Sequence, residues 1–366
     1  MHKKVLIISD SAAGLFLASL LERDGHHVTL VCTGDNFNPS LHHRNFLIPF
    51  YPQNEEITHS LSLLKPLFLQ ELTLQPIEIP PQSYEDKILK PFVGFGEATN
   101  AASKELSFYN STRQYQLNLN LETETSHLIT RFKGKILKYS ELKRLDFSGT
   151  KVDKLVINGT EELVFDEYIF MNSPNDICPL VPNDVLGIRT KSRIAKTETW
   201  SRLTISYTHT EQIYDGNSCI FLTPSNPTEQ SSCVGTFMPA LQNSDSSQNS
   251  IWEAYIANDF GDDAEYVSNT IKNLRKMIRK AFPQIETHSR ESLVVAQCAA
   301  GNFSWFAENK EVHQIAENFI FSPEISFNGL GMTRSALAAT STYELFLKQI
   351  SKDHSTRTEP TILSSN

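Results

Sequence analysis

The sequence predicts an α/β fold with two parts: a parallel sheet flanked by helices, and an interleaved, mostly antiparallel β domain. The first observation is residues 4–32, which read as a buried strand, a tight turn, a helix and a second strand. The second is a series of short, alternating strands between residues 190 and 237. The third is size, because 366 residues with 40% apolar and 20% charged side chains can bury two cores.

The N-terminal segment has the pattern of a βαβ unit. Val5 to Ile8 is apolar and β-branched, as in a strand buried on both faces. From Ala12 to Arg23 the apolar residues recur at helical spacing, and Gly25 ends the helix. The next strand, His27 to Val31, is reached by a crossover, which makes it parallel to the first. Such a Rossmann-type unit can hold a dinucleotide's diphosphate at its helix N-terminus. An ordinary βαβ unit that binds nothing is the alternative.

The dinucleotide fingerprint Gly-x-Gly-x-x-Gly is degenerate in this unit. It falls on residues 9–14, Ser-Asp-Ser-Ala-Ala-Gly, where only Gly14 is kept to bring helix and strand close together. The acid expected to bind ribose after the second strand is replaced by Cys32. For Arg44, a surface arginine is an equally good interpretation. The candidate cofactor-binding residues at this end of the chain are Ser9, Ser11, Ala12, Ala13, Gly14, Asp35 and Arg44.

Several further elements can be predicted along the chain. The patterns predict a helix from Glu55 to Leu74 broken near Pro66, a hairpin at Asn158-Gly159, a strand at Tyr168 to Met171, a helix over about 264–282 capped by Asp262 or Asp263, strands at Ser292 to Ala300 and Phe319 to Phe321, and a last helix to about Gln349.

Composition excludes several classes of function. A net charge of −9 argues against a nucleic-acid partner, and the basic residues of 272–280 are interpreted as the solvated face of an amphipathic helix. No segment is long enough to cross a membrane. Five widely spaced cysteines without a Cys-x-x-Cys pair predict a cytoplasmic chain with reduced thiols and no metal site. The oligomeric state stays open.

Three further stretches resemble the D-amino-acid oxidase and amine oxidase group of FAD-dependent flavoproteins. Cys219-Ile-Phe-Leu-Thr-Pro with Val234-Gly-Thr236 is similar to the paired strands of that group's substrate domain. Leu274 to Pro283 is similar to its helix ending before a proline, and Gly329-Leu-Gly-Met-Thr333 to its flavin-side turn.

The resemblance implies FAD as cofactor, with the isoalloxazine ring near Gly329, Gly331, Met332 and Thr333. It also implies an FAD-binding domain over 1–75, 126–188 and 292–350, a substrate domain over 76–125 and 189–291, and a flexible tail over 351–366.

The chain also departs from this group. Asn172-Ser173-Pro174 replaces the Ala-x-Gly turn expected near the diphosphate, and 297–302 lacks the arginine that binds an amino-acid carboxylate. Trp305 and Arg334 are candidates for the substrate pocket, with a core aromatic and a surface arginine as the alternatives.

The first hypothesis for function is therefore an FAD-dependent, oxidase-like oxidoreductase that removes a hydride from an amine or a similar small-molecule or protein-borne substrate. A flavoprotein-like binding protein without cofactor is the second hypothesis, and a flavin monooxygenase the third. No catalytic acid or base can be named from the sequence.

Overall fold

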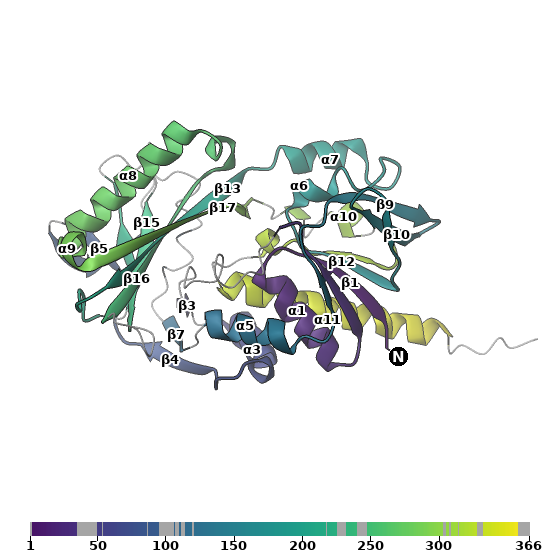
Figure 1. The fold of residues 1–366 in the computed structure, drawn as a ribbon, viewed down its shortest axis with the longest axis horizontal. Helices are drawn as coiled ribbons and strands as arrows, with labels where there is room; N and C mark the ends of the chain where they lie inside the picture. The colour runs from purple at the N-terminus through teal and green to yellow at the C-terminus, as the bar shows by residue number, and fades with distance from the viewer. Residues whose placement is uncertain are drawn as a thin grey trace, which may run out of the picture.

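The computed structural model describes residues 2–34, 50–52, 54–85, 87–94, 106, 110, 114–118, 121–216, 218–224, 232–239, 247–302, 305–306, 309–313, 315–327 and 332–357. The chain forms two neighbouring parts, each built on its own sheet (Figure 1). Their arrangement confirms the predicted α/β fold, in which a parallel sheet is combined with a mostly antiparallel one.

The first part is built on five parallel strands in the order β18-β12-β1-β2-β8. The N-terminal βαβ unit has the predicted bounds for its helix and second strand, and its two strands are parallel. The strands of this sheet are β1 (Lys4–Ile8), β2 (His27–Val31), β8 (Lys135–Leu137), β12 (Glu167–Phe170) and β18 (Phe319–Phe321).

Each face of the parallel sheet packs into its own apolar core. Alternate strand residues such as Val5 and Ile7 pack under α1 and α11, whereas Leu6 and Ile8 pack on the other face. The first face is covered by α1 (Ala12–Arg23), α3 (Glu55–Leu64), α5 (Leu121–Arg131) and α11 (Met332–Arg357). The second is covered by the antiparallel strands β9 (Leu142–Ser148), β10 (Lys151–Ile157) and β11 (Glu161–Leu163), and by α6 (Pro174–Ile177), α7 (Ile188–Ala195) and α10 (Lys310–His313).

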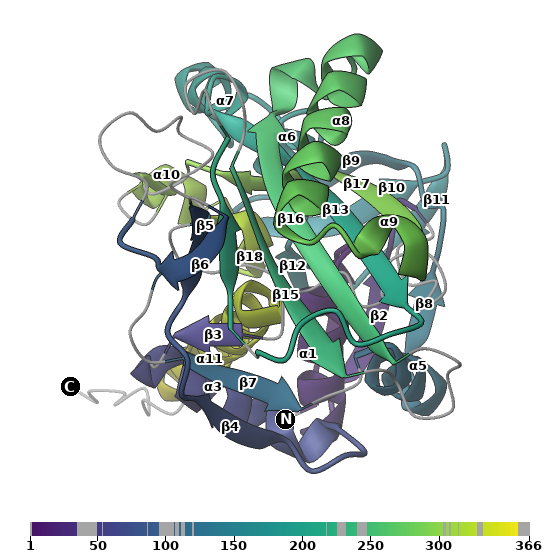
Figure 2. The same cartoon turned by 90° about the vertical axis from the view of Figure 1, so that its left-hand side faces the viewer.

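The second part is built on a seven-stranded sheet in the order β17-β13-β16-β15-β14-β5-β6, in which only the β14–β5 pair is parallel. Helix α8 packs on one face through Leu274 and Ile278 (Figure 2). The strands are β5 (Gln82–Glu85), β6 (Ile88–Pro91), β13 (Thr199–His209), β14 (Ile220–Leu222), β15 (Cys233–Pro239), β16 (Gln248–Ala257) and β17 (Ser289–Gly301), and the helices are α8 (Ala264–Ala281) and α9 (Ile285–His288).

A small antiparallel sheet and three short 3₁₀ turns complete the described structure. The turns η1 (Lys65–Leu67), η3 (Asn258–Phe260) and η5 (Glu324–Ser326) follow α3, β16 and β18 respectively. The small sheet consists of β3 (Phe50–Pro52), β7 (Gln114–Asn118) and β4 (Thr73–Ile77), with β7 in the centre.

Local sequence patterns predicted most of these elements, but two helices end at other residues than predicted. The hairpin at Asn158-Gly159 is confirmed, with φ angles of 49° and 90° that suit its tight turn. The helix predicted to reach Leu74 ends at Leu64, because Pro66 lies in η1 and the chain then turns into β4. Helix α11 continues past Gln349 to Arg357.

Candidate functional site

The carboxyl edge of the parallel sheet brings together the loops that follow β1, β2 and β12. In the strand order, β2 lies on one side of β1 and β12 on the other, so the direction in which strands are added to the sheet reverses beside β1. Ligands of open α/β sheets bind in the crevice that opens at such a switch point. Ser9 and Asp10 follow β1, Thr33 follows β2, and Asn172 follows β12 at this edge.

Ser9 and Gly14 are fitted to one another. Ser9 is fully buried, and its Oγ accepts a hydrogen bond from the backbone N–H of Ser11 at 3.3 Å. A Cβ placed on Gly14 would lie 2.3 Å from the Cβ of Ser9, far inside contact distance. The close contact between helix and strand that was expected of Gly14 is therefore present, and it is made against the side chain of Ser9.

The first turn of α1 presents backbone N–H groups to the same edge. Ser11 is the N-cap residue, with extended backbone angles, but its side chain makes no capping hydrogen bond. Its hydroxyl instead lies 3.2 Å from that of Ser9. The next residues, Ala12 and Ala13, are small and buried. A helix start with no side-chain cap and no bulky residue is suited to bind an anion.

Asp10 joins the three loops at the switch point. Its carboxylate accepts hydrogen bonds from the backbone N–H of Thr33 at 2.7 Å, from that of Gly34 at 3.3 Å, and from the hydroxyl of Thr33. It also accepts one from Asn172 Nδ2 at 2.7 Å, while the Asp10 N–H donates to Asn172 Oδ1 at 2.8 Å. We call this set of contacts the Asp10 bridge.

The Asp10 bridge places a negative charge beside the start of α1. All four donors to the carboxylate are neutral groups, so they stabilise the anion without adding a positive charge. A second carboxyl group lies near it. Surrounding protein desolvates Asp176, and the charge of Asp10 adds repulsion, so the pKa of Asp176 is raised. The edge therefore combines a helix start that is suited to bind an anion with acidic side chains.

Asp10 was not among the residues singled out from the sequence. The sequence feature that could have identified Asp10 is its charge, because it is the one charged residue in the turn 9–14 between a buried strand and a helix. The replacement of the ribose-binding acid by Cys32 has a clear structural counterpart, because Cys32 is fully buried and packs in the core under α1. Asp35 and Arg44 lie outside the described residues.

The start of α11 is the second predicted cofactor-binding element. Met332 and Thr333 lie in its first turn and are each 1% exposed, and α11 packs along α1. Arg334 is also buried, at 5% exposure, rather than a surface arginine. Ser335 donates to Glu324 of η5 at 2.5 Å, which ties the helix start to the turn that follows β18. Gly329 and Gly331 lie outside the described residues.

Trp305 lies on the outer side of the parallel-sheet core, beside α7. The guanidinium of Arg193 lies 4.2 Å from the centre of its ring, and Phe306 stacks against it at 4.3 Å. Its Nε1 donates to Thr197 Oγ1 at 3.3 Å. Together with exposed residues of α7 it lines a groove of about 480 Å³. The described contacts of Trp305 do not include Arg334.

The face of the seven-stranded sheet opposite α8 carries buried polar side chains that the sequence analysis did not single out. Thr204 and Glu253 are cross-strand neighbours, 1% and 0% exposed, and Thr236 is fully buried. The Oγ1 of Thr204 has no hydrogen-bond partner among the described residues. An unsatisfied buried hydroxyl costs free energy, so its presence in this face needs a structural or functional reason.

Comparison with known proteins gives matches in structure only. No family model matches the chain, and no curated protein does. An oxidoreductase from Methanosarcina mazei superposes with a TM-score of 0.64 at 8% identity, over 93% of this chain and 100% of its own. A putrescine oxidase variant redesigned in cofactor binding gives 0.62 at 10% identity, over 96% and 99%.

A third similar structure, a candidate FAD-containing monooxygenase from Photorhabdus luminescens, gives a TM-score of 0.55 at 11% identity, over 97% of this chain and 93% of its own. The likeness establishes the fold alone. The shared fold extends over both parts of the chain.

The part of the chain that the structure describes contains neither a candidate metal site nor a candidate membrane-spanning helix. No group of three or more His, Cys, Asp or Glu side chains is placed to hold a metal ion. Among the same residues, no helix is both long and apolar enough to span a bilayer.

Proposed function

We propose that this chain is an FAD-dependent oxidoreductase of the oxidase-like kind, which removes a hydride from an amine or a similar substrate. The observation that carries the proposal is the structural match to an oxidoreductase, a putrescine oxidase and a candidate FAD-containing monooxygenase, each over 93% or more of this chain. The start of α1 at the switch point of the parallel sheet supports it, because that is where this class of sheet binds a dinucleotide.

The described residues fit the diphosphate half of FAD at the start of α1. The backbone N–H groups of Ala12 and Ala13 would hold the diphosphate beside the hydroxyl of Ser11, and Gly14 allows α1 to lie close to β1. Met332 and Thr333 would face the ring, and Asp35, Arg44, Gly329 and Gly331 remain candidates from the sequence. The bound flavin would supply the hydride-accepting chemistry, and the protein its position and electrostatic field.

On the substrate side, the sheet face around Thr204 is our first candidate for contact with the amine. The unsatisfied hydroxyl of Thr204 can accept a hydrogen bond from an amine N–H, and the fully buried Glu253 is its cross-strand neighbour. Trp305 and Arg334 remain proposals as substrate residues. The electron acceptor would be oxygen or another oxidant.

Spectroscopy and oxygen uptake test this function. We expect the purified protein, alone or after addition of FAD, to show the visible absorption of bound oxidised flavin. A panel of primary amines, diamines and amino acids added without oxygen should include one that bleaches this absorption. Oxygen consumption with and without NADPH then separates an oxidase from a monooxygenase. Protein that binds flavin but is bleached by no amine would contradict the amine substrate.

A binding protein without cofactor is the second candidate, and the Asp10 bridge favours it. The bridge places a carboxylate beside the helix start that would hold the diphosphate, and the ribose-binding acid is replaced by the buried Cys32. Colourless protein that also fails to take up added FAD would support this candidate and refute the first.

A further inference from the structure

Helix α8 carries one exposed stripe in which acidic and basic residues are separated. At about 100° per residue, five exposed positions fall within an arc of about 80°. From the start of the helix these are Glu265, Asn269, Lys272, Lys276 and Lys280. Asp259 and Asp262 lie just before the helix and are also exposed. The stripe therefore begins acidic, is neutral at its centre and ends basic.

The outward face of α8 is open to a partner. The opposite face packs on the seven-stranded sheet through Leu274 and Ile278, and the helix lies on the outside of the molecule (Figure 1). The basic half of the stripe borders an open groove of about 800 Å³ that also includes Arg275, Arg279, Glu286 and Glu291.

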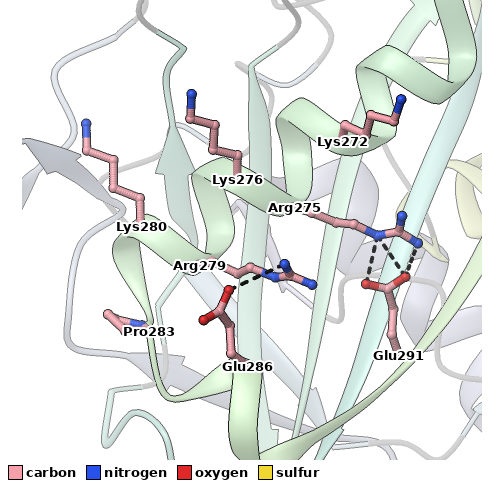
Figure 3. A pocket seen from close by; sticks show the side chains of 8 residues that line it. All are labelled: Lys272, Arg275, Lys276, Arg279, Lys280, Pro283, Glu286 and Glu291. Atoms are coloured by element: carbon pink, nitrogen blue, oxygen red, sulfur yellow. Dashed lines mark hydrogen bonds and ion pairs between the residues drawn. The ribbon is translucent and has the colours of Figure 1, made fainter.

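The basic residues of α8 belong to two sets. Arg275 donates to Glu291 at 2.9 and 3.0 Å, and Arg279 lies 3.4 Å from Glu286. The three lysines point the other way, away from both glutamates (Figure 3). Within the described residues, no carboxylate forms an ion pair with Lys272, Lys276 or Lys280.

The helix itself does not explain this row of lysines. Like charges four residues apart on a helix repel one another. Cations do stabilise the carboxyl end of a helix, but this effect is limited to the last turn. Lys272 is the ninth of 18 residues in α8, two turns before its end. A partner that brings negative charge to the stripe would offset the repulsion.

We propose that the partner is a second copy of this chain, with the two α8 helices antiparallel about a two-fold axis near residues 270–271. In this arrangement Glu265 faces the partner's Lys276, and Lys280 faces the acidic turn before the partner's helix. Each contact occurs twice, as a two-fold axis requires. Because the chain has a net charge of −9, two copies that meet through their acidic surfaces repel one another.

The contact is expected to be weak and sensitive to salt. A helix of 18 residues is about 27 Å long, and a pair of such helices buries less than the about 800 Å² per partner of a standard interface. Leu293 and Val295 on the edge strand β17 can extend it. They are 37% and 41% exposed, and pair with Ile205 and Leu203, which lie beneath α8.

Sedimentation equilibrium of the full chain tests the proposal, independently of any flavin. We expect a reversible monomer–dimer equilibrium whose dissociation constant rises at least about tenfold between about 50 and about 500 mM NaCl. The variant K272E/K276E, with an acidic stripe, and the variant D262K/E265K, with a basic stripe, should each be monomeric at low salt. A 1:1 mixture of the two should dimerise again, because each then meets the opposite charge.

The control K133E/K196E lowers the net charge by as much as K272E/K276E, at exposed lysines outside α8, and should dimerise like the unmodified chain. Circular dichroism confirms that each variant is folded. A monomeric unmodified chain, a dimer that survives both stripe variants, or a mixture that stays monomeric would each overturn the proposal.

Discussion

Replacing Asp10 with asparagine should lower stability and raise affinity for FAD at the same time. The introduced asparagine side chain would have nearly the same shape as the aspartate but no charge. Its oxygen can still accept from the backbone N–H groups of Thr33 and Gly34. Its amide group, however, would face the Nδ2 of Asn172, so two donors would meet where one hydrogen bond of 2.7 Å existed.

The size of both effects follows from these contacts. Leaving a donor unsatisfied costs about 1–3 kcal/mol, which lowers the melting temperature by about 2–4 °C for each kcal/mol. If the two charges of the FAD diphosphate lie about 7 Å from the Asp10 carboxylate, in a dielectric of about 40–80, repulsion weakens binding by about 1.2–2.4 kcal/mol. Removing it should tighten binding by roughly 8- to 60-fold.

Thermal denaturation and titration of flavin fluorescence measure the two effects. The matched control is D10N/N172D, which moves the carboxylate across the loop and lets the introduced amide at position 10 donate to it. This double variant should recover the melting temperature, while its affinity returns toward that of the unmodified chain. An unchanged melting temperature in D10N would refute the bridge. Unchanged or weaker FAD binding would refute the repulsion.

Three other substitutions test separate parts of the structure. Gly14→Ala should destabilise the chain by about 1–3 kcal/mol in urea denaturation, because its Cβ meets Ser9, and S9G/G14A should recover most of the loss. Thr204→Val, which removes an unsatisfied hydroxyl, should leave stability unchanged or raise it by about 1 kcal/mol; a loss of more than this would show that the hydroxyl has a partner within the protein. Burial lowers the pKa of His209 from 6.5 to about 4. Between these two pH values the His209 side chain is therefore neutral in the folded chain and protonated in the unfolded chain. Its contribution of about 3 kcal/mol is thus present above pH 6.5 and lost as the pH falls to about 4, and His209→Gln should flatten the pH dependence of unfolding over that range.

The sequence predicted those features that rest on neighbouring residues. The bounds of α1 and β2, the turn at Asn158 and the cap of α8 all depend on contacts within a few positions; for the cap, predicted as Asp262 or Asp263, the structure has Asp263. The Asp10 bridge could not be predicted in this way. Its partners Thr33 and Asn172 lie 23 and 162 positions away, and only the strand order β12-β1-β2 brings them together.

The candidate substrate residues show the same limit. Trp305 could be singled out from the sequence as an aromatic candidate, but its contact with Arg193 depends on where α7 packs. The polar face around Thr204 and Glu253 was missed because alternation along a strand does not show which face is turned toward a ligand. Residue 292, proposed as a domain boundary, falls within β17 of the seven-stranded sheet.

The most direct test of the central claim is an equilibrium titration of the unmodified chain with FAD and, separately, with riboflavin. If the start of α1 holds the diphosphate, FAD should bind at one molecule per chain and at least about tenfold more tightly than riboflavin, which has no diphosphate. A chain that binds neither flavin, or that binds both equally well, would contradict the claim.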